Sequence, residues 1–252
     1  MTVRFHEIAE AHHRILNPFT QEKLALLGEV CRLEARMRQL DLACGKGEML
    51  CQWAARHRIS GIGVDLSTVF LDAARVRADE LGVADRVRFE HADASTYRPE
   101  HTAFDLVSCI GATWIGGGLA GTVELLRPAL RRDGLILIGE PYWKAEPPEE
   151  ALAAFQLNPE DFVSLAATAD RLAGAGVELV EMVLADEDCW DRYVAAQWWT
   201  LDRWLRANPR NPDAPAVRQF RDESRRTHLT YGRHLLGWGV FVGRLGQQSG
   251  AN

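Results

Sequence analysis

Short apolar runs alternate along this chain with longer stretches in which apolar residues return every three or four positions. The runs are typical of buried parallel strands, and the longer stretches are typical of amphipathic helices. Strands are expected at residues 38–43, 59–65, 86–91, 104–111, 135–139, 177–185 and 236–245. Helices between most of these strands predict a doubly wound α/β sheet.

Two helices are expected before the first strand, over residues 5–13 and 20–36, with Thr20 as the N-cap of the second. Further helices are expected from residue 48 onward and over residues 68–82, 119–130 and 151–175, the last broken at Asn158-Pro159. Because residues 1–36 precede the sheet, we interpret them as an N-terminal helical segment of a single domain spanning residues 1–252.

About fifty residues of helical pattern separate the sixth expected strand from the seventh. One apolar stripe begins near Trp190, a turn follows at Asn208–Pro215, and a charged helix covers residues 216–234. This pattern predicts that residues 187–235 form a helical cap inserted over the carboxyl edge of the sheet.

Composition narrows the class of protein. With 252 residues and 47% hydrophobic content, the chain can bury the core of one α/β domain. A net charge of −6 argues against nucleic acid or an anionic membrane as partner. Five cysteines without paired spacing predict reduced thiols and no metal site. No apolar run is long enough to span a membrane, and the first residues lack a signal-peptide core, so we expect a cytoplasmic protein.

The chemistry of the chain centres on residues 38–48, where a buried strand meets a loop with Gly45 and Gly47 and then a helix. Such a corner is typical of nucleotide-type ligand sites. A dinucleotide fingerprint requires a third small residue where this chain has Leu50. Asp41 and Glu48 flank the loop, and their carboxylates would repel a pyrophosphate but attract an ammonium or sulfonium group.

Asp65 ends the second expected strand, twenty residues after Gly45. At this spacing an acidic side chain accepts hydrogen bonds from both ribose hydroxyls of a bound nucleoside. The alternative is that Asp65 or Ser67 only caps the following helix. Asp93 follows the third expected strand, where it could serve simply as a turn residue.

Residues Asp41 to Glu48, Asp-Leu-Ala-Cys-Gly-Lys-Gly-Glu, resemble motif I of the class I S-adenosylmethionine (SAM) dependent methyltransferases, D/E-x-G-x-G-x-G, with Ala43 replacing the first glycine. Phe104–Val107 is similar to the family's F-D-x-V, and residues 126–139 are similar to L-x-P-G-G-x-L-x-I, with Arg-Arg-Asp-Gly in place of Pro-Gly. The resemblance covers residues 38–143. It is closest to the bacterial small-molecule group that includes ubiquinone/menaquinone and sterol methyltransferases.

This resemblance implies a seven-stranded sheet in the order 3-2-1-4-5-7-6, with strand 7 antiparallel, and SAM as cofactor with S-adenosylhomocysteine as product. It implies Asp41, Ala43, Gly45 and Gly47 around the methionyl part and Asp65 with Leu66 at the ribose. The adenine contacts it implies are the Asp93 carboxylate and the Ala94 N–H. The fourth strand's end is expected beneath the methionyl chain, at Cys109, Ile110 and Gly111.

The implied reaction is in-line methyl transfer to a small, partly apolar or aromatic acceptor, so alignment is the protein's main contribution. A general base is needed only if the nucleophile arrives protonated. The candidate bases are His12, His13, Glu140, Tyr142 and Tyr193. The candidate acceptor contacts are Trp114, Trp143 and Tyr193. The loop after the fourth strand, Ile-Gly-Ala-Thr-Trp, lacks the family's N/D-P-P-Y/F motif of amino methylation, which together with the acidic charge disfavours nucleic acid and release-factor substrates.

Two other functions remain compatible with these residues. One is a non-catalytic SAM-binding protein, and the less favoured one is an NAD(P)-dependent oxidoreductase. The expected assembly is a monomer or a homodimer.

Overall fold

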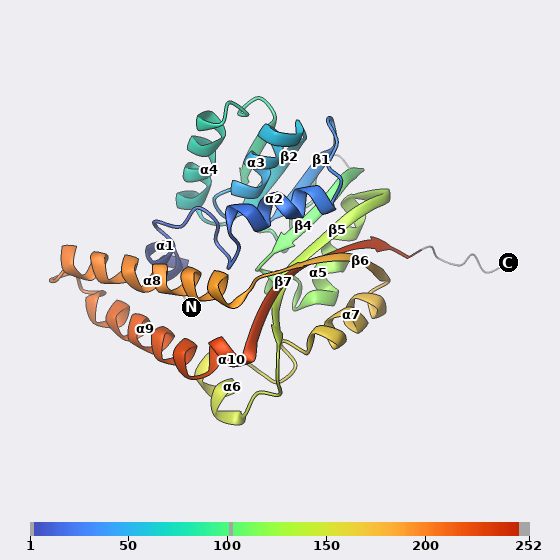
Figure 1. Cartoon of the computed structure of the whole chain (residues 1–252). Coiled ribbons are helices and arrows are strands. Elements are labelled where there is room, and N and C mark those ends of the chain that lie inside the picture. The colour runs from blue at the N-terminus through green and yellow to red at the C-terminus, as the bar shows by residue number, and fades with distance from the viewer. Residues whose placement is uncertain (1–2, 101–102, 247–252) are drawn as a thin grey trace.

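The computed structural model describes residues 3–100 and 103–246, and all structural statements below concern these residues. A seven-stranded sheet in the order β3-β2-β1-β4-β5-β7-β6 crosses the molecule (Figure 1). Its strands are β1 (Arg38–Leu42), β2 (Ser60–Asp65), β3 (Val87–His91), β4 (Phe104–Ile110), β5 (Leu130–Trp143), β6 (Val177–Leu184) and β7 (Leu236–Leu245). The pairs from β3 to β5 are parallel, and β7 is antiparallel to both β5 and β6, so the predicted order is confirmed.

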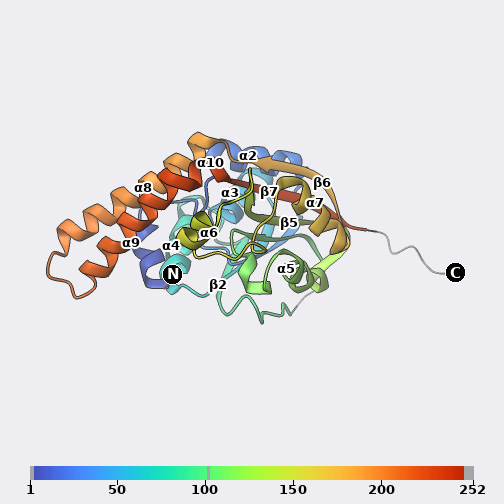
Figure 2. The same cartoon turned by 90° about the horizontal axis from the view of Figure 1, so that it is seen from below.

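Helices cover both faces of the sheet (Figures 1 and 2). One hydrophobic cluster joins the sheet to α2 (Gln21–Val30), α3 (Glu48–His57) and α4 (Thr68–Glu80). A second cluster joins the other face to α5 (Leu119–Leu126) and α7 (Leu165–Gly174). Apolar residues recur at helical spacing in these helices because each presents one side to the sheet.

Between β6 and β7 the chain forms α8 (Glu187–Ala207), α9 (Ala214–Thr227) and the short α10 (Arg233–Leu235). Helices α8 and α9 run side by side as a hairpin that extends away from the sheet in both views (Figures 1 and 2). The hairpin shares a third hydrophobic cluster with α1 (Val3–Ala9), to which Ala9, Leu201 and Val217 contribute.

Several element boundaries differ from the sequence prediction. Helix α1 ends at Ala9 rather than residue 13, and α2 ends at Val30 because Arg32 and Arg36 adopt positive φ. Strand β5 extends to Trp143 rather than residue 139, because its pairing with β7 continues to Leu236. Instead of one broken helix over 151–175 there are two, α6 (Glu149–Phe155) and α7.

The predicted helix caps are present. Thr20 accepts a hydrogen bond from the Lys23 N–H at 3.2 Å, and Ser67 accepts one from the Phe70 N–H at 3.1 Å. Within the described ranges, no helix is long and apolar enough to cross a membrane.

Candidate active site

The loop between β1 and α3 bends sharply beneath a neighbouring segment of chain. Ala43, Gly45 and Gly47 all have positive φ, and Ala43 tolerates this conformation where the family motif has glycine. A Cβ atom on Gly45 would lie 2.7 Å from Leu16 Cδ1, and one on Gly47 would lie 2.5 Å from Phe89 Cε1. The glycines therefore allow close approach of neighbouring side chains on both sides of the loop.

Asp65 fixes this loop from the end of β2. Its Oδ2 accepts a hydrogen bond from the Gly45 N–H at 2.8 Å, and its Oδ1 accepts one from the Ser67 N–H at 2.8 Å. One carboxylate thus joins the glycine loop to the start of α4. Ser67 caps α4, which is the alternative that the sequence left open. Asp65 also lies against the glycine loop, as expected.

Asp41 of β1 is a buried acid beneath the loop, with 3% of its surface exposed. Ser108 of β4 donates a hydrogen bond to Asp41 Oδ1 at 2.6 Å. Burial raises the pKa of Asp41 to about 7, and the nearby charge of Asp65 acts in the same direction. A cation placed beside Asp41 would reverse this effect and favour the ionised form.

Glu48 does not offer a free charge to a ligand. Its carboxylate accepts from Arg77 Nε at 2.8 Å and from Arg77 Nη2 at 2.9 Å, and Arg14 lies 3.9 Å away. Of the two acids that flank the loop, Asp41 is therefore the one that pairs with no cationic side chain among the described residues.

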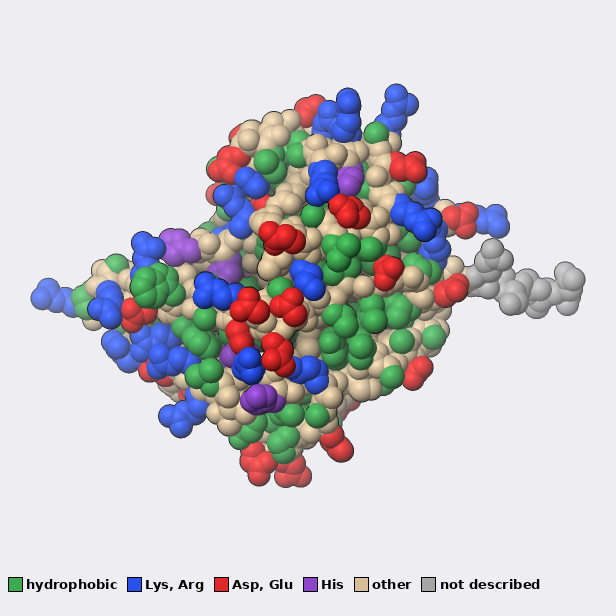
Figure 3. All heavy atoms as spheres, viewed as in Figure 1, with side chains coloured by type: hydrophobic (Ala, Val, Ile, Leu, Met, Phe, Trp, Pro, Cys, Tyr) green, Lys and Arg blue, Asp and Glu red, His purple; other side chains and the backbone are tan. Residues whose placement is uncertain are grey.

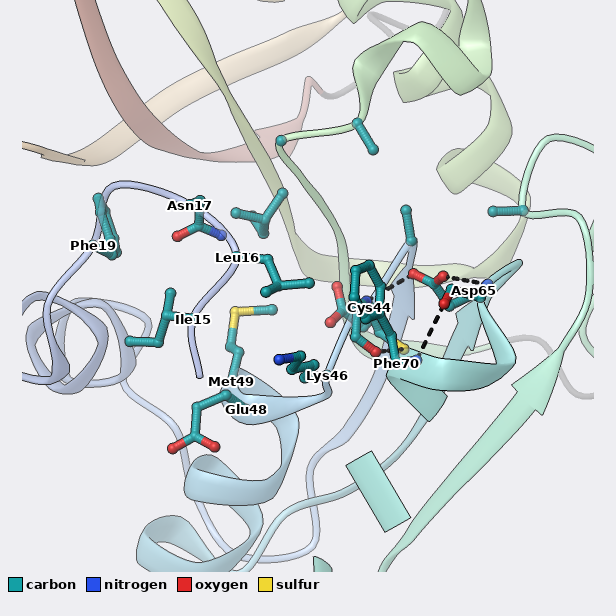
Figure 4. A pocket seen from close by; sticks show the side chains of 18 of the residues that line it. Ile15, Leu16, Asn17, Phe19, Cys44, Lys46, Glu48, Met49, Asp65 and Phe70 are labelled. Carbon is teal, nitrogen blue, oxygen red and sulfur yellow. Dashed lines mark hydrogen bonds between the residues drawn. The ribbon is translucent and has the colours of Figure 1, made fainter. Parts of the chain in front are cut away.

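A cavity of about 230 Å³ opens over the carboxyl ends of β1, β2 and β4 (Figure 4). Most of the predicted cofactor contacts line it: Asp41, Ala43, Gly45, Asp65, Leu66, Asp93, Ala94, Ile110 and Gly111. Gly47 and Cys109 are not among the lining residues, since Gly47 packs on Phe89 and Cys109 belongs to the hydrophobic cluster beneath α5.

Asp93 forms a turn of its own at the mouth of the cavity. Its Oδ1 accepts from the Ser95 N–H at 2.9 Å and from the Ser95 hydroxyl at 2.7 Å. These hydrogen bonds lower the pKa of Asp93 below its usual range. Asp93 therefore stabilises a turn, and both Asp93 and Ala94 also line the cavity.

The roof of the cavity comes from residues 10–19, which connect α1 to α2 and which we call the strap. Its side chains Ile15, Leu16, Asn17 and Phe19 line the cavity and bring mainly apolar surface to it (Figure 4). Lys46, between the two loop glycines, holds the strap. Its Nζ donates to the carbonyls of Glu10, Ala11 and His13 at 2.7, 3.0 and 2.8 Å.

Lys46 is 9% exposed, and burial lowers its pKa. All three of its ammonium protons have acceptors in the strap, so the side chain holds the strap against the loop. The sequence pattern gave no signal for this function, because a lysine between two glycines also suits an exposed loop.

The strap is also attached to α8 through the fully buried Glu10. The Tyr193 hydroxyl donates to Glu10 Oε1 at 2.6 Å, and Gln197 Nε2 donates to the same oxygen. His13 Nδ1 lies 3.2 Å from Glu10 Oε2, and His13 Nε2 donates to the Tyr193 carbonyl at 2.9 Å. Burial, with the charge of Glu10, raises the pKa of Tyr193 well above its usual range.

Most candidate bases and acceptor contacts lie outside the lining of this cavity. His13 and Tyr193 take part in the strap attachment, and His12 is exposed on the strap. Tyr142 lines a separate cavity beside Trp190, and Trp143 is buried against Phe155 with ring centroids 6.0 Å apart. Trp114 does line the cavity, with 73% of its surface exposed, on a turn between Gly111 and Gly117.

Glu140 is 2% exposed at the end of β5 and does not line the cavity either. Burial raises the pKa of Glu140 from 4.5 to about 7. The folded protein holds a proton that the unfolded chain releases, so stability falls as the pH rises from 4.5 through 7.

Glu140→Gln is therefore expected to stabilise the fold by about 2–3 kcal/mol at pH 8 and by much less at pH 5. Thermal melts of both proteins at the two pH values measure this difference. An equal gain at both pH values would show that Glu140 is not a buried titrating group.

Known proteins of similar sequence and structure agree with a nucleoside-binding site. A family model described as a methyltransferase domain matches residues 40–134. The uncharacterized protein YjhP of Escherichia coli strain K12 is 47% identical over 241 residues, which cover 95% of this chain and 97% of that protein. A SAM-dependent methyltransferase from Geobacter sulfurreducens, solved in complex with S-adenosylhomocysteine, is 49% identical with a TM-score of 0.93 over 97% of this chain and 98% of that one.

The chain belongs to the SAM-dependent methyltransferases. A second family member from Thiobacillus denitrificans, also solved with S-adenosylhomocysteine, is 46% identical with a TM-score of 0.92 over 97% of this chain and 99% of that one. The resemblance drawn from motif I is confirmed, and membership in this family decides against the oxidoreductase interpretation. This methyltransferase therefore has the class I fold with an α8–α9 hairpin between β6 and β7.

Proposed function

We propose that this methyltransferase binds SAM in the cavity over β1, β2 and β4 and methylates a small, partly apolar acceptor. The observation that carries the proposal is the composition of one continuous cavity. Asp41, Asp65 and Asp93 line its floor and mouth, while the strap and Trp114 supply apolar and aromatic surface.

The residues fit the cofactor on chemical grounds. Asp41 is buried, with Ser108 as its hydrogen-bond donor, and an ammonium group would supply the missing positive partner. Asp65 is proposed to accept the ribose hydroxyls, and Asp93 with Ala94 to hold the adenine.

SAM supplies a sulfonium-activated methyl group, which an acceptor nucleophile displaces in line. The residues of the chain orient the reactants and exclude water. Leu16 and Phe19 close the cavity from above, and Trp114 offers an exposed ring on which a flat acceptor can stack. Since His12, His13, Glu140, Tyr142 and Tyr193 do not line the cavity, we propose that catalysis depends on alignment rather than on one of these groups as base.

The proposal includes a small-molecule acceptor rather than a nucleic acid, a cytoplasmic location and a monomer or homodimer. Calorimetric titration with SAM, S-adenosylhomocysteine and NADH tests the cofactor, followed by a screen of thiols, amines and phenols for methyl transfer. Binding of the adenosyl ligands with turnover of an acceptor supports the proposal. Binding of the adenosyl ligands without turnover in a broad screen would favour a non-catalytic SAM-binding protein. Binding of NADH alone would overturn the proposal.

The pH dependence of binding tests the contact proposed for Asp41. Because its pKa is about 7 in the free protein, a ligand whose ammonium group lies beside Asp41 must displace the proton of that carboxyl at lower pH. The affinity for S-adenosylhomocysteine is therefore expected to rise about tenfold from pH 6 to pH 8. Calorimetry in buffers of different ionisation enthalpy should detect release of nearly one proton at pH 6.

Asp41→Asn is the matched control, because it keeps the shape and removes the titrating group. Its affinity should be low and nearly constant across this pH range. If Asp41→Asn keeps the pH dependence of the native protein, another group is responsible for that dependence and Asp41 is not part of the proposed site.

A further inference from the structure

Helix α8 packs on two of its sides and leaves a third side exposed. Tyr193 and Gln197 face the strap, and Leu201 packs in the cluster shared with α9. The exposed side carries Arg192, Trp199, Arg203 and Arg206, whose spacings of seven, four and three residues align them along one face. Trp199 is 68% exposed.

The exposed face continues onto α9. Asp202 links the two helices by pairing with Arg206 at 2.7 Å and with Arg221 of α9 at 3.1 Å. Arg218 and Arg225 lie seven residues apart on one side of α9, and Leu229 follows four residues later with 57% exposure. We call this surface the outer face of the hairpin. Lys and Arg side chains gather there over α8 and α9 (Figure 3).

Charge is distributed unevenly along the hairpin, because Glu187, Asp188 and Asp191 all lie in the first turns of α8, before Arg192. Residues 192–226 contain eight arginines and four carboxylates, a net charge of +4, so the remaining residues carry −10. Within the part of the chain that the structure describes, Arg192 and Arg203 have no carboxylate within 4.0 Å. The overall net charge, from which the sequence disfavoured an anionic membrane, conceals this separation.

We propose that the outer face of the α8–α9 hairpin binds the surface of an anionic lipid bilayer. An exposed tryptophan among arginines suits the headgroup region, where the ring reaches the acyl boundary and the guanidinium groups stay with the phosphates. Leu229 adds an aliphatic side chain, which favours a lipid surface over nucleic acid because it offers no plane for base stacking. This inference does not depend on the identity of the methyl acceptor.

Co-sedimentation of the full chain with vesicles tests the proposal. Vesicles of phosphatidylcholine alone are compared with vesicles that also contain phosphatidylglycerol, at low and high salt. Binding is expected only with phosphatidylglycerol and should weaken with salt. Trp199→Ala combined with Arg203→Glu should lower the partition coefficient at least about tenfold. Arg132→Glu is the matched control, since Arg132 is exposed on β5 and has no ion-pair partner among the described residues.

Other outcomes would overturn the proposal. Equal binding of the two vesicle types, or unchanged binding of the double variant, would exclude a lipid function of this face. Binding of a single-stranded oligonucleotide without vesicle binding would assign the face to nucleic acid. A dimer that Arg203→Glu dissociates, again without vesicle binding, would assign it to a second copy of the chain. Unchanged calorimetric binding of S-adenosylhomocysteine confirms that each variant is folded.

Discussion

Asp65→Ala is expected to weaken the binding of S-adenosylhomocysteine at least about a hundredfold, or about 3 kcal/mol. The substitution removes the proposed acceptor of the ribose hydroxyls. It also removes the acceptor of the Gly45 and Ser67 N–H groups, so the glycine loop loses its link to α4. Calorimetry measures the affinity, and a thermal melt establishes that the variant is folded.

Asp72→Ala is the matched control, because Asp72 is an exposed acid on α4 whose ion pair with Arg75 lies on the surface. It should bind the ligand as the native protein does. If Asp65→Ala binds within about twofold of the native protein, an effect too small to represent a lost charged hydrogen bond, the ribose assignment is wrong.

Lys46→Met is expected to destabilise the protein by about 2–4 kcal/mol and to free the strap from the loop. Methionine retains the apolar stem but leaves three carbonyls without their donor, each a costly loss when buried. For a chain of this size the melting temperature should fall by about 5–10 °C. Hydrogen exchange of residues 10–19 should accelerate, and the affinity for S-adenosylhomocysteine should fall because the strap lines the cavity.

Lys23→Met is the control for this experiment. Lys23 also donates to a backbone carbonyl, that of Leu184 at 2.9 Å, but its side chain is partly exposed and lies on α2. Its substitution should leave exchange in residues 10–19 unchanged. Similar exchange of the strap in the native protein and in Lys46→Met would show that Lys46 does not hold it.

The sequence was sufficient for most of the cavity floor, whereas the sheet order followed from the resemblance to the family. The cavity floor depends on local signals: Asp41 within a short buried strand, glycines at fixed spacing after it, and Asp65 at the end of the next strand. Such residues need only their own strand and loop in order to face the ligand.

The roof of the cavity could not be predicted in the same way. Glu10, Lys46 and Tyr193 come from three distant parts of the chain, and their partners are backbone carbonyls or each other. No spacing along the sequence encodes such contacts, and the sequence alone therefore makes Tyr193 and His13 candidate bases. Trp143 illustrates the same limit, because the extension of β5 that buries it depends on pairing with β7.

The attachment of Glu10 to both the strap and α8 has a consequence for ligand binding. The strap covers one side of the cavity proposed for the cofactor, so a cofactor bound there would lie in contact with it. Since Tyr193 and Gln197 hold Glu10, any displacement of the strap either breaks their hydrogen bonds or carries α8 along. The affinity for a ligand under the strap and the position of the hairpin are therefore thermodynamically linked, and whatever stabilises one arrangement of α8 also shifts the equilibrium of that ligand.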